Sequence, residues 1–303
     1  MLAAYILLFL LFLVLPLGAL IIKSVQDSKG HFIGLSNYAL YLKEPALFQS
    51  FFNSLFIAIV STIFVVVFAF LFAYAITRTC MPFKGFFRLI ALIPLLSPSI
   101  LAAIALVYWF GNKGILKALL FGHSIYGPIG IILASIYWTF PHALMILSTS
   151  LSLSDSRLYE AAEVLKTSKL RAFLTITIPG ARYGIISTTF VVFTQVFTDF
   201  GVPKVIGGNY NVLATDIYKE VVGMQNFQMG AVISLVLLIP AMVAFFIDQY
   251  SRKKQISLLT SRSVVFNPKK SWGVDMLMLG YCSIIAIIIL LMIGMAQFGA
   301  LVK

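Results

Sequence analysis

The segment Leu158-Tyr159-Glu160-Ala161-Ala162-Glu163, with Ile176-Thr177-Ile178-Pro179 downstream, forms a charged island in an otherwise very apolar chain. A polar stretch of this length between two apolar stretches is expected to lie in water. Its apolar residues Leu158, Ala162 and Leu165 recur at the spacing i, i+4 and i+7, which places them on one face of a helix. An apolar helix face in water predicts a partner protein into which it docks.

Composition indicates a membrane protein. Hydrophobic residues make up 61% of the 303 residues and charged residues only 11%, whereas an ordinary soluble domain has about 25% charged residues. Each membrane-spanning helix requires roughly 20 apolar residues, and several such segments are present. The sequence therefore predicts an all-α, polytopic membrane helical bundle. The predicted spans are Leu2–Ile22, Ser54–Ile76, Leu89–Phe110, Ile129–Leu151, Tyr183–Phe200, Met229–Gln249 and Val274–Leu301.

The positions of the Lys and Arg residues predict how the spans are oriented. With the N-terminus inside, 14 of the 22 basic residues fall in inside loops and 8 in outside regions. Cytoplasmic loops of membrane proteins collect Lys and Arg, so we expect the N-terminus and the 152–182 loop to be cytoplasmic. This topology accounts for the net charge of +12. Nucleic-acid binding is disfavoured because no basic patch is interleaved with stacking aromatic residues.

The chain lacks the motifs of common enzyme and metal sites. It has no Gly-x-x-x-x-Gly-Lys-Ser/Thr phosphate loop, no His-Glu-x-x-His, no Cys-x-x-Cys and no serine-nucleophile elbow. His31, His123 and His142 are scattered, and Cys80 in an inside loop is not expected to meet Cys282 in a span. We therefore expect no catalytic residue, no bound cofactor, no metal and no ATP hydrolysis in this chain.

Polar residues within the fourth and fifth spans are candidates for a translocation path. Hydroxyl groups in membrane helices more often bond a neighbouring helix than touch a solute. Gln195 and Asp199 cost more to bury and are better candidates, although Asp199 could instead be hydrated at the outer end of its span. His142 suits either an interhelical contact or a path. The candidates are Ser135, Thr139, His142, Thr188, Gln195, Thr198 and Asp199.

Proline and capping residues predict several helix boundaries outside and inside the spans. Residues 31–42 are expected to form a short interfacial helix that Pro45 breaks, and Pro94 and Pro98 are expected to interrupt the third span. Pro141 and Pro240 lie within the fourth and sixth spans. They are expected either to shape the bundle or to mark segments that flex beside a path.

Within the 152–182 loop, the sequence predicts two short helices. Asp155 or Ser156 is expected to cap a helix that runs to about Lys166, and Thr167-Ser168 is expected to break it. A second helix should then continue to about Leu174, before the turn into the fifth span.

The 152–182 loop resembles the signature loop of permease subunits of binding-protein-dependent ABC importers. In that family, Glu-Ala-Ala is followed by Gly four residues later and then by an apolar-x-apolar-Pro ending. Lys166 stands at the glycine position, so the helix is expected to end one residue later, at Thr167-Ser168. The matching residues are Glu160, Ala161, Ala162, Ile176, Ile178 and Pro179.

Two further segments support this resemblance, which covers about residues 30–250. Gly34-Leu35-Ser36-Asn37-Tyr38 with Asn53-Ser54-Leu55 looks like the start of the shared permease core. Asp199-Phe200-Gly201-Val202-Pro203 with Gly207-Gly208 is similar to the branch that carries ferric iron and 2-aminoethylphosphonate. The implied fold is a six-span type I permease core with a seventh span added.

The resemblance implies partners and a mechanism. The loop would dock into a cytoplasmic ABC ATPase that holds ATP and Mg, and a periplasmic binding protein would deliver the solute to the bacterial inner membrane. The solute would be 2-aminoethylphosphonate, or next ferric iron, or a polyamine. Glu160 would pair with a basic group or cap a helix of the ATPase. Leu158, Ala162 and Leu165 would be buried contacts with the ATPase. The implied ATPase-coupling loop consists of Leu158, Tyr159, Glu160, Ala161, Ala162, Leu165, Lys166, Ile176, Ile178 and Pro179.

Residues 274–303 are expected to begin a second permease unit. The tail Gly299-Ala300-Leu301-Val302-Lys303 echoes Gly18-Ala19-Leu20-Ile21-Ile22-Lys23 at the end of the first span. The chain then divides into a first span with an outside segment (1–53), a permease core (54–250), a basic cytoplasmic linker (251–273) and the seventh span. The second unit could be fused, or the assembly could be a homodimer or heterodimer.

Two functions of other classes compete with an importer permease. An ion-coupled secondary transporter usually carries inverted repeats and an ionisable group near the membrane mid-plane, and these spans are almost free of mid-plane charge. A membrane scaffold would not require polar faces on the fourth and fifth spans. Co-purification with an ATPase would separate the permease from both.

Overall fold

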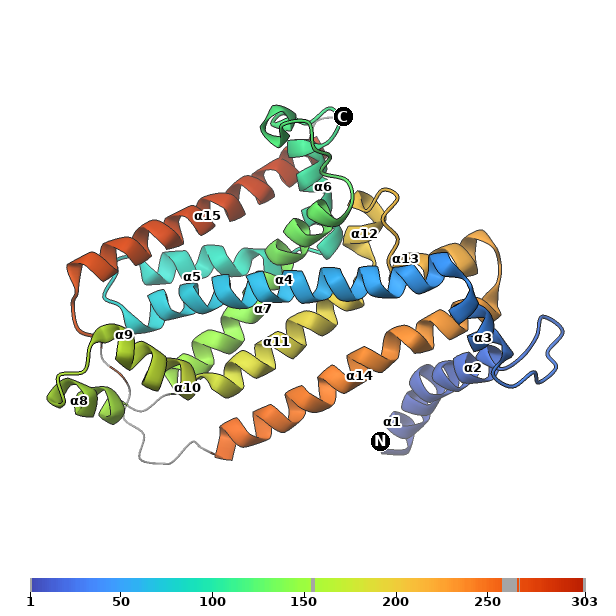
Figure 1. The fold of residues 1–303 in the computed structure, drawn as a ribbon, viewed down its shortest axis with the longest axis horizontal. Helices are drawn as coiled ribbons and strands as arrows, with labels where there is room; N and C mark the ends of the chain where they lie inside the picture. Colours follow the sequence, from blue (N-terminus) through green and yellow to red (C-terminus); the bar gives the residue numbers. More distant parts are fainter. Residues whose placement is uncertain (1, 154–155, 258–265, 267, 302–303) are drawn as a thin grey trace.

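Helices dominate the protein (Figure 1). The computed structural model describes residues 2–153, 156–257, 266 and 268–301. Within these residues, β-structure is limited to an isolated antiparallel bridge between Gln26 and Phe32. The predicted all-α class is confirmed.

The helical elements follow one another through mostly short connections. The first are α1 (Leu2–Phe9), η1 (Leu10–Val14), α2 (Leu15–Ser24), α3 (Ser36–Lys43) and α4 (Pro45–Arg78). Next come α5 (Lys84–Leu92), η2 (Ile93–Leu96), α6 (Ser99–Phe110), η3 (Lys117–Leu120) and α7 (Pro128–Ser152). The 152–182 loop holds α8 (Ser156–Val164), α9 (Lys169–Ala172), η4 (Phe173–Thr177) and α10 (Ile178–Gly180). The last are α11 (Arg182–Phe197), α12 (Gly201–Ile206), α13 (Leu213–Tyr218), η5 (Lys219–Gly223), α14 (Phe227–Ser257) and α15 (Trp272–Leu301).

Helix α4 forms the centre of the bundle. It packs on α7 and α11, which also contact each other, and Val65, Leu147 and Val192 on these three helices are fully buried. An ideal Cβ atom on Gly184 of α11 would lie 2.2 Å from Ser150 Oγ of α7. Small residues allow membrane helices to approach closely, so Gly184 is what brings α7 and α11 together.

The described chain contains five helices long and apolar enough to cross a membrane, and up to seven spans if each of two bent pairs counts as one. The expected interruption of the third span at Pro94 and Pro98 is confirmed, because the chain bends by 102° between the Lys84–Leu96 run and α6. Ser97 is extended there, with φ −111° and ψ 141°, because the ring of the following Pro98 disfavours helical angles. Helix α11 ends at Phe197 and is bent by 62° from the Lys169–Gly180 run.

Pro45 acts differently from the prediction. The short helix α3 ends at Lys43, and Pro45 is the first residue of α4 rather than only a break. Proline suits the first helical position because its missing N–H would have no partner there. Helix α4 therefore begins nine residues before the predicted start of the second span at Ser54, so Asn53 and Ser54 lie inside it.

The two terminal spans differ in how they meet the core. Helix α15 packs along α5, α6 and α4, whereas α2 contacts α14 (Figure 1). In the Ala4–Ser24 span, no residue of the most apolar window is buried. This first span therefore presents nearly its whole apolar surface outward.

Gly184→Ala is expected to destabilise the purified chain, because the new methyl group would overlap Ser150 Oγ at 2.2 Å and Ser150 Cβ at 2.3 Å. Overpacking of this kind costs about 1–3 kcal/mol. The double variant Gly184→Ala/Ser150→Gly removes both atoms and should recover part of the loss. Thermal unfolding in detergent measures each effect. Gly280→Ala in α15, where a Cβ meets nothing within 4 Å, is the control; equal losses in both alanine variants would contradict the assignment.

Candidate functional site: the 152–182 loop and the polar helix interface

The 152–182 loop lies at one end of the bundle, beyond the ends of α4 and α7 (Figure 1). Ser156 begins α8, and its hydroxyl donates to Glu160 Oε1 at 3.2 Å. The other predicted cap, Asp155, lies outside the described residues. Thr167-Ser168 lies in the connection between α8 and α9, although α8 itself already ends at Val164.

The second helical run is longer than predicted and continues to Gly180 instead of ending near Leu174. Phe173 explains the extension, because its ring packs edge-on against Phe70 and Tyr74 of α4, with centroid distances of 6.1 and 5.5 Å. This contact holds η4 along α4 up to the bend at Ala181. Among the motif residues of this run, Ile176 and Ile178 are partly buried and Pro179 is exposed.

Arg78, the last residue of α4, joins the loop to the bundle. Its guanidinium carbon lies 5.0 Å from the ring centroid of Tyr159 and 4.3 Å from that of Phe266, and Nη2 donates to the Leu151 carbonyl. The Tyr159 hydroxyl is hydrogen bonded to Thr177 Oγ1 at 2.9 Å. We call Arg78, Tyr159 and Phe266 the Arg78 clamp. The ring and hydroxyl of Tyr159 therefore contact the bundle, and this residue of the loop holds α8 to α4 and η4.

The outer surface of α8 and its C-terminal turn is apolar. Leu158, Val164 and Leu165 are 55%, 82% and 78% exposed. Ala162 is only 8% exposed, so the prediction that it shares an outward face with Leu158 and Leu165 is wrong. Ala162 lies one turn after Tyr159 and belongs to the side of the helix that the Arg78 clamp turns inward. Glu160, Ala161 and Lys166 are exposed.

Lys166 adopts the backbone conformation that glycine has in a helix-terminating turn. Its φ is +50°, Thr167 N donates to the Ala162 carbonyl at 2.9 Å, and Lys166 N donates to the Glu163 carbonyl at 2.9 Å. These two bonds define a Schellman turn. The expectation that lysine shifts the helix end to Thr167-Ser168 is wrong, because the two bonds satisfy the last carbonyls at the position where the glycine would stand.

Residues after Pro268 form polar contacts with the 152–182 loop. Lys269 Nζ forms an ion pair with Glu163 Oε2, and Lys169 Nζ donates to Ser271 Oγ at 2.8 Å. Asp275 then accepts from Cys80 N at 2.8 Å and so fixes the start of α15 beside the end of α4. The sequence predicted a basic linker here but not its contacts with the loop.

The threonines among the predicted path residues bond within their own helices. Thr139, Thr188 and Thr198 donate to the carbonyls four residues earlier, at 2.7, 2.8 and 2.8 Å. A short hydroxyl side chain reaches the i−4 carbonyl of its own helix easily. The expected bonds to a neighbouring helix are therefore not formed, and these hydroxyls do not by themselves mark a path.

Six other buried polar atoms, on α4, α7 and α11, have no hydrogen-bond partner among the described residues. These three helices pack on one another. Buried polar groups are normally paired, so these atoms mark where water, a solute or a partner chain can bind. We call this set the polar strip. Its atoms are Ser61 Oγ, Thr62 Oγ1, Ser135 Oγ, Trp138 Nε1, His142 Nδ1 and Gln195 Oε1.

The prediction included Ser135, His142 and Gln195 but missed three members of the polar strip. Ser61 and Thr62 are adjacent polar residues in the most apolar predicted span, and this interruption is the signal that could have identified them. Trp138 gave no such signal because its ring is apolar apart from one N–H. His142 lies one turn after Trp138, and the two ring centroids are 6.2 Å apart.

Asp199 joins two breaks in the helices. Its Oδ1 accepts from Ser99 Oγ at 2.7 Å, at the start of α6, and its Oδ2 accepts from Val202 N at 2.9 Å, in α12. The carboxylate thus ties the bend of the third span to the end of α11. These bonds give Asp199 a structural role that the sequence alternatives, a path or simple hydration, did not include.

This loop at the end of a polytopic bundle suits a transport protein, and comparison with known families is decisive. The family described as "Binding-protein-dependent transport system inner membrane component" matches residues 81–257. The chain belongs to this family. Membership places it among multi-pass inner-membrane components of transport systems, which are not enzymes.

Similar proteins include two curated permeases. The putative ferric transport system permease protein FbpB 1 of Haemophilus influenzae is 27% identical over 253 residues, which cover 81% of this chain and 40% of that protein. The spermidine/putrescine transport system permease protein PotB of Escherichia coli is 26% identical over 214 residues, covering 68% and 78%. The chain thus spans less than half of the ferric relative.

A solved structure has the same fold. The bacterial alginate ABC transporter in complex with an alginate pentasaccharide-bound periplasmic protein superposes with a TM-score of 0.63 at 17% identity. The match covers 87% of this chain and 95% of that chain. At this identity the similarity concerns the fold, and it confirms the predicted permease architecture.

Arg78→Ala should loosen the 152–182 loop, because it removes two cation–π contacts and a charged hydrogen bond worth together about 2–3 kcal/mol. Faster hydrogen exchange of the α8 amides, with α14 unchanged, is the expected result. Arg182→Ala, which removes a cation–π contact of 4.7 Å to Tyr183, is the matched control and should leave α8 unchanged. Unaltered α8 exchange in Arg78→Ala would refute the clamp.

Lys166→Gly should stabilise the loop by about 1 kcal/mol, since a residue with a Cβ pays roughly that cost for left-handed angles and glycine does not. Hydrogen exchange measures the effect, and the α8 amides should exchange more slowly. Ala161→Gly, within the same helix, should have the opposite sign because glycine costs about 1 kcal/mol in a helix interior. Destabilisation by Lys166→Gly would show that this turn is not strained.

Proposed function

We propose that this chain is a transmembrane permease subunit of an ATP-driven importer, and that α8 with its C-terminal turn transmits force from a separate ATPase. The observation that carries the proposal is the exposed apolar surface of Leu158, Val164 and Leu165 on a helix that the Arg78 clamp holds in place. A positioned helix with an apolar outer surface suits docking into a groove. Glu160, exposed beside this surface, would supply a charged contact.

The proposed partners follow from the family. The ATPase, which would itself bind ATP and Mg, would dock at the end of the bundle that carries the 152–182 loop. We place this end, together with the N-terminus, in the cytoplasm. A periplasmic substrate-binding protein would dock at the opposite end; the solved alginate transporter, which has the same fold, forms a complex with a periplasmic protein. Movement of α8 would reach the spans through Arg78 and Leu151, which lie at the ends of α4 and α7.

We further propose that the solute passes along the polar strip. Its unpaired atoms would exchange hydrogen bonds with water or solute at low cost, since no protein bond must break. Gln195 and Thr198 also line a cavity of about 230 Å³ beside α14, next to Asp248. His142, near Trp138, remains a candidate for the same path.

The chain is proposed to work with a second permease unit, and α15 is proposed to begin one. Two observations support this: the ferric relative is long enough for two such units, and the first span has no buried residue in its most apolar window. The second unit would cover that surface. The sequence echo between the two spans supports it too, although Val302 and Lys303 lie outside the described residues.

For the solute, ferric iron is the first proposal, because the match to the FbpB permease covers 81% of this chain, and a polyamine is second, because the match to PotB covers 68%. 2-Aminoethylphosphonate, the first expectation from the Asp199–Pro203 motif, is kept as an alternative.

Uptake of radiolabelled ferric iron, spermidine and 2-aminoethylphosphonate by cells with and without this chain would decide among them. Equal uptake of all three in both strains would refute an importer of these solutes. An ion-coupled transporter would instead move solute without a co-purifying ATPase.

Leu165→Asp is expected to abolish co-purification of the ATPase and ATP-dependent uptake, because a carboxylate in a buried apolar contact costs several kcal/mol. Glu160→Lys should also reduce co-purification of the ATPase and uptake, because it reverses the charge at this position. Ala162→Asp is less informative because Ala162 is buried within this chain. Val222→Asp, 58% exposed at the opposite end, is the control and should leave ATPase binding intact. Normal uptake by Leu165→Asp would overturn the docking proposal.

A further inference from the structure

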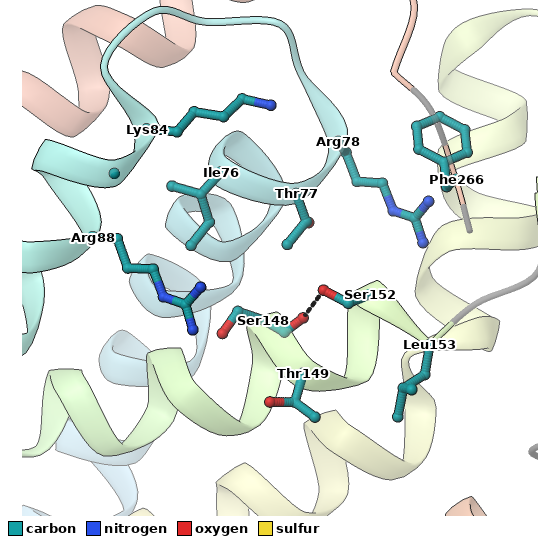
Figure 2. Close-up of a pocket in the computed structure, with 11 residues that line it drawn as sticks. Ile76, Thr77, Arg78, Lys84, Arg88, Ser148, Thr149, Ser152, Leu153 and Phe266 are labelled. Carbon is teal, nitrogen blue, oxygen red and sulfur yellow. Dashed lines mark hydrogen bonds between the residues drawn. The ribbon is translucent and has the colours of Figure 1, made fainter.

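The end of the bundle that carries the 152–182 loop also contains a cavity (Figure 2). It has a volume of about 460 Å³ and lies between the end of α4, the start of α5 and the end of α7, with Phe266 on one side. Arg78, Lys84 and Arg88 line it, and none of the described residues along its wall is acidic. The cavity therefore collects positive charge that its own wall does not neutralise.

Lys84 and Arg88 are one turn apart on α5, and their side chains extend into the space between α5 and α7 (Figure 2). Within the described residues, neither makes a hydrogen bond or an ion pair. Like charges that face one space repel each other, and a bound anion relieves this repulsion. The two residues are thus available for a ligand.

Hydroxyl groups line the opposite wall on α7. Ser148, Thr149 and Ser152 donate to carbonyls one turn earlier in their own helix, with the Thr149 and Ser152 bonds at 2.8 and 2.7 Å. Each of those carbonyls also accepts a backbone N–H within the helix. A hydroxyl can therefore rotate toward a ligand without leaving the carbonyl oxygen unpaired. Figure 2 shows all three residues beside the cavity.

The first turn of α5 adds donors. Gly85 lines the cavity, and a Cβ built on it would meet nothing within 4 Å, so its backbone is open to a ligand. The first N–H groups of a helix have no acceptor within the helix, and its N-terminus favours an anion. Charge, hydroxyls and backbone donors therefore converge from α4, α5 and α7.

The neighbouring surface indicates where the anion comes from. Phe83, Phe86 and Leu89, interleaved with Lys84 and Arg88, are 73%, 58% and 69% exposed. Apolar residues outward and basic residues beside them are typical of a helix at a membrane interface with anionic lipid. A soluble anion would not require this apolar rim.

We propose that the cavity binds a phosphate group, and that the headgroup of an acidic phospholipid supplies it. The phosphate lies between Lys84 and Arg88 on one side and the α7 hydroxyls on the other, and the acyl chains lie along Phe86 and Leu89. The inference does not depend on which solute is transported.

The test is native mass spectrometry of the purified full chain titrated with phosphatidylglycerol or phosphatidylcholine of the same acyl chains. Lys84→Gln/Arg88→Gln should bind phosphatidylglycerol roughly 20-fold more weakly, since each basic residue near an anionic surface contributes about a factor of five. Binding of phosphatidylcholine should be weak and unchanged by the substitutions. Lys253→Gln, a basic residue on α14 that does not line the cavity, is the matched control and should bind like the unmodified chain.

A second arm distinguishes lipid from free phosphate, with the melting temperature as readout so that folding is checked in each variant. Phosphatidylglycerol should raise the melting temperature of the unmodified chain, and 10-fold more inorganic phosphate should not. A rise with inorganic phosphate alone, lost in the double variant, would overturn the lipid assignment. Equal lipid binding by the double variant and the unmodified chain would overturn the site itself.

Discussion

The burial of one cation, Arg78, organises the end of the molecule that carries the 152–182 loop. A buried charge is tolerated only when it is paired or stacked, so the guanidinium requires the Tyr159 ring, the Phe266 ring and the Leu151 carbonyl together. These three groups come from three separate segments, and Arg78 comes from a fourth. The one requirement therefore fixes the end of α4 to the end of α7, to α8 and to the chain before α15.

This arrangement separates two surfaces of α8. On the inward side, Tyr159 and Ala162 are in contact with the rest of the chain. On the outward side, Leu158, Val164 and Leu165 are exposed, and this is the surface proposed to bind a partner. A rigid inward side matters for transmission of force, because a loosely held helix would absorb a displacement instead of passing it to the spans. The Schellman turn at Lys166 ends the helix in a defined place.

The cationic cavity shares Arg78 and Phe266 with the Arg78 clamp. The proposed lipid site and the loop that carries the proposed ATPase contact therefore share the Arg78 side chain. At the bundle's interior the contrast is clear: the polar strip carries polar atoms without bonds in the described chain, whereas Asp199 holds Ser99 and Val202. Hydrogen-bonded junctions thus lie at the ends of the helices, and unpaired polar atoms lie between them.

The sequence by itself determined the membrane class, most of the spans and the Glu160–Pro179 loop, because apolar segment length and local spacing are properties of neighbouring residues. The tertiary structure alone decided that Ala162 is turned inward, and that Ser61, Thr62 and Trp138 join Ser135, His142 and Gln195 in the polar strip. Likewise Lys84 and Arg88 read as ordinary inside-loop charges until α7 was placed opposite them. The reason is physical: burial, and the pairing of distant groups, depend on which helices meet, and no local pattern in the chain encodes that.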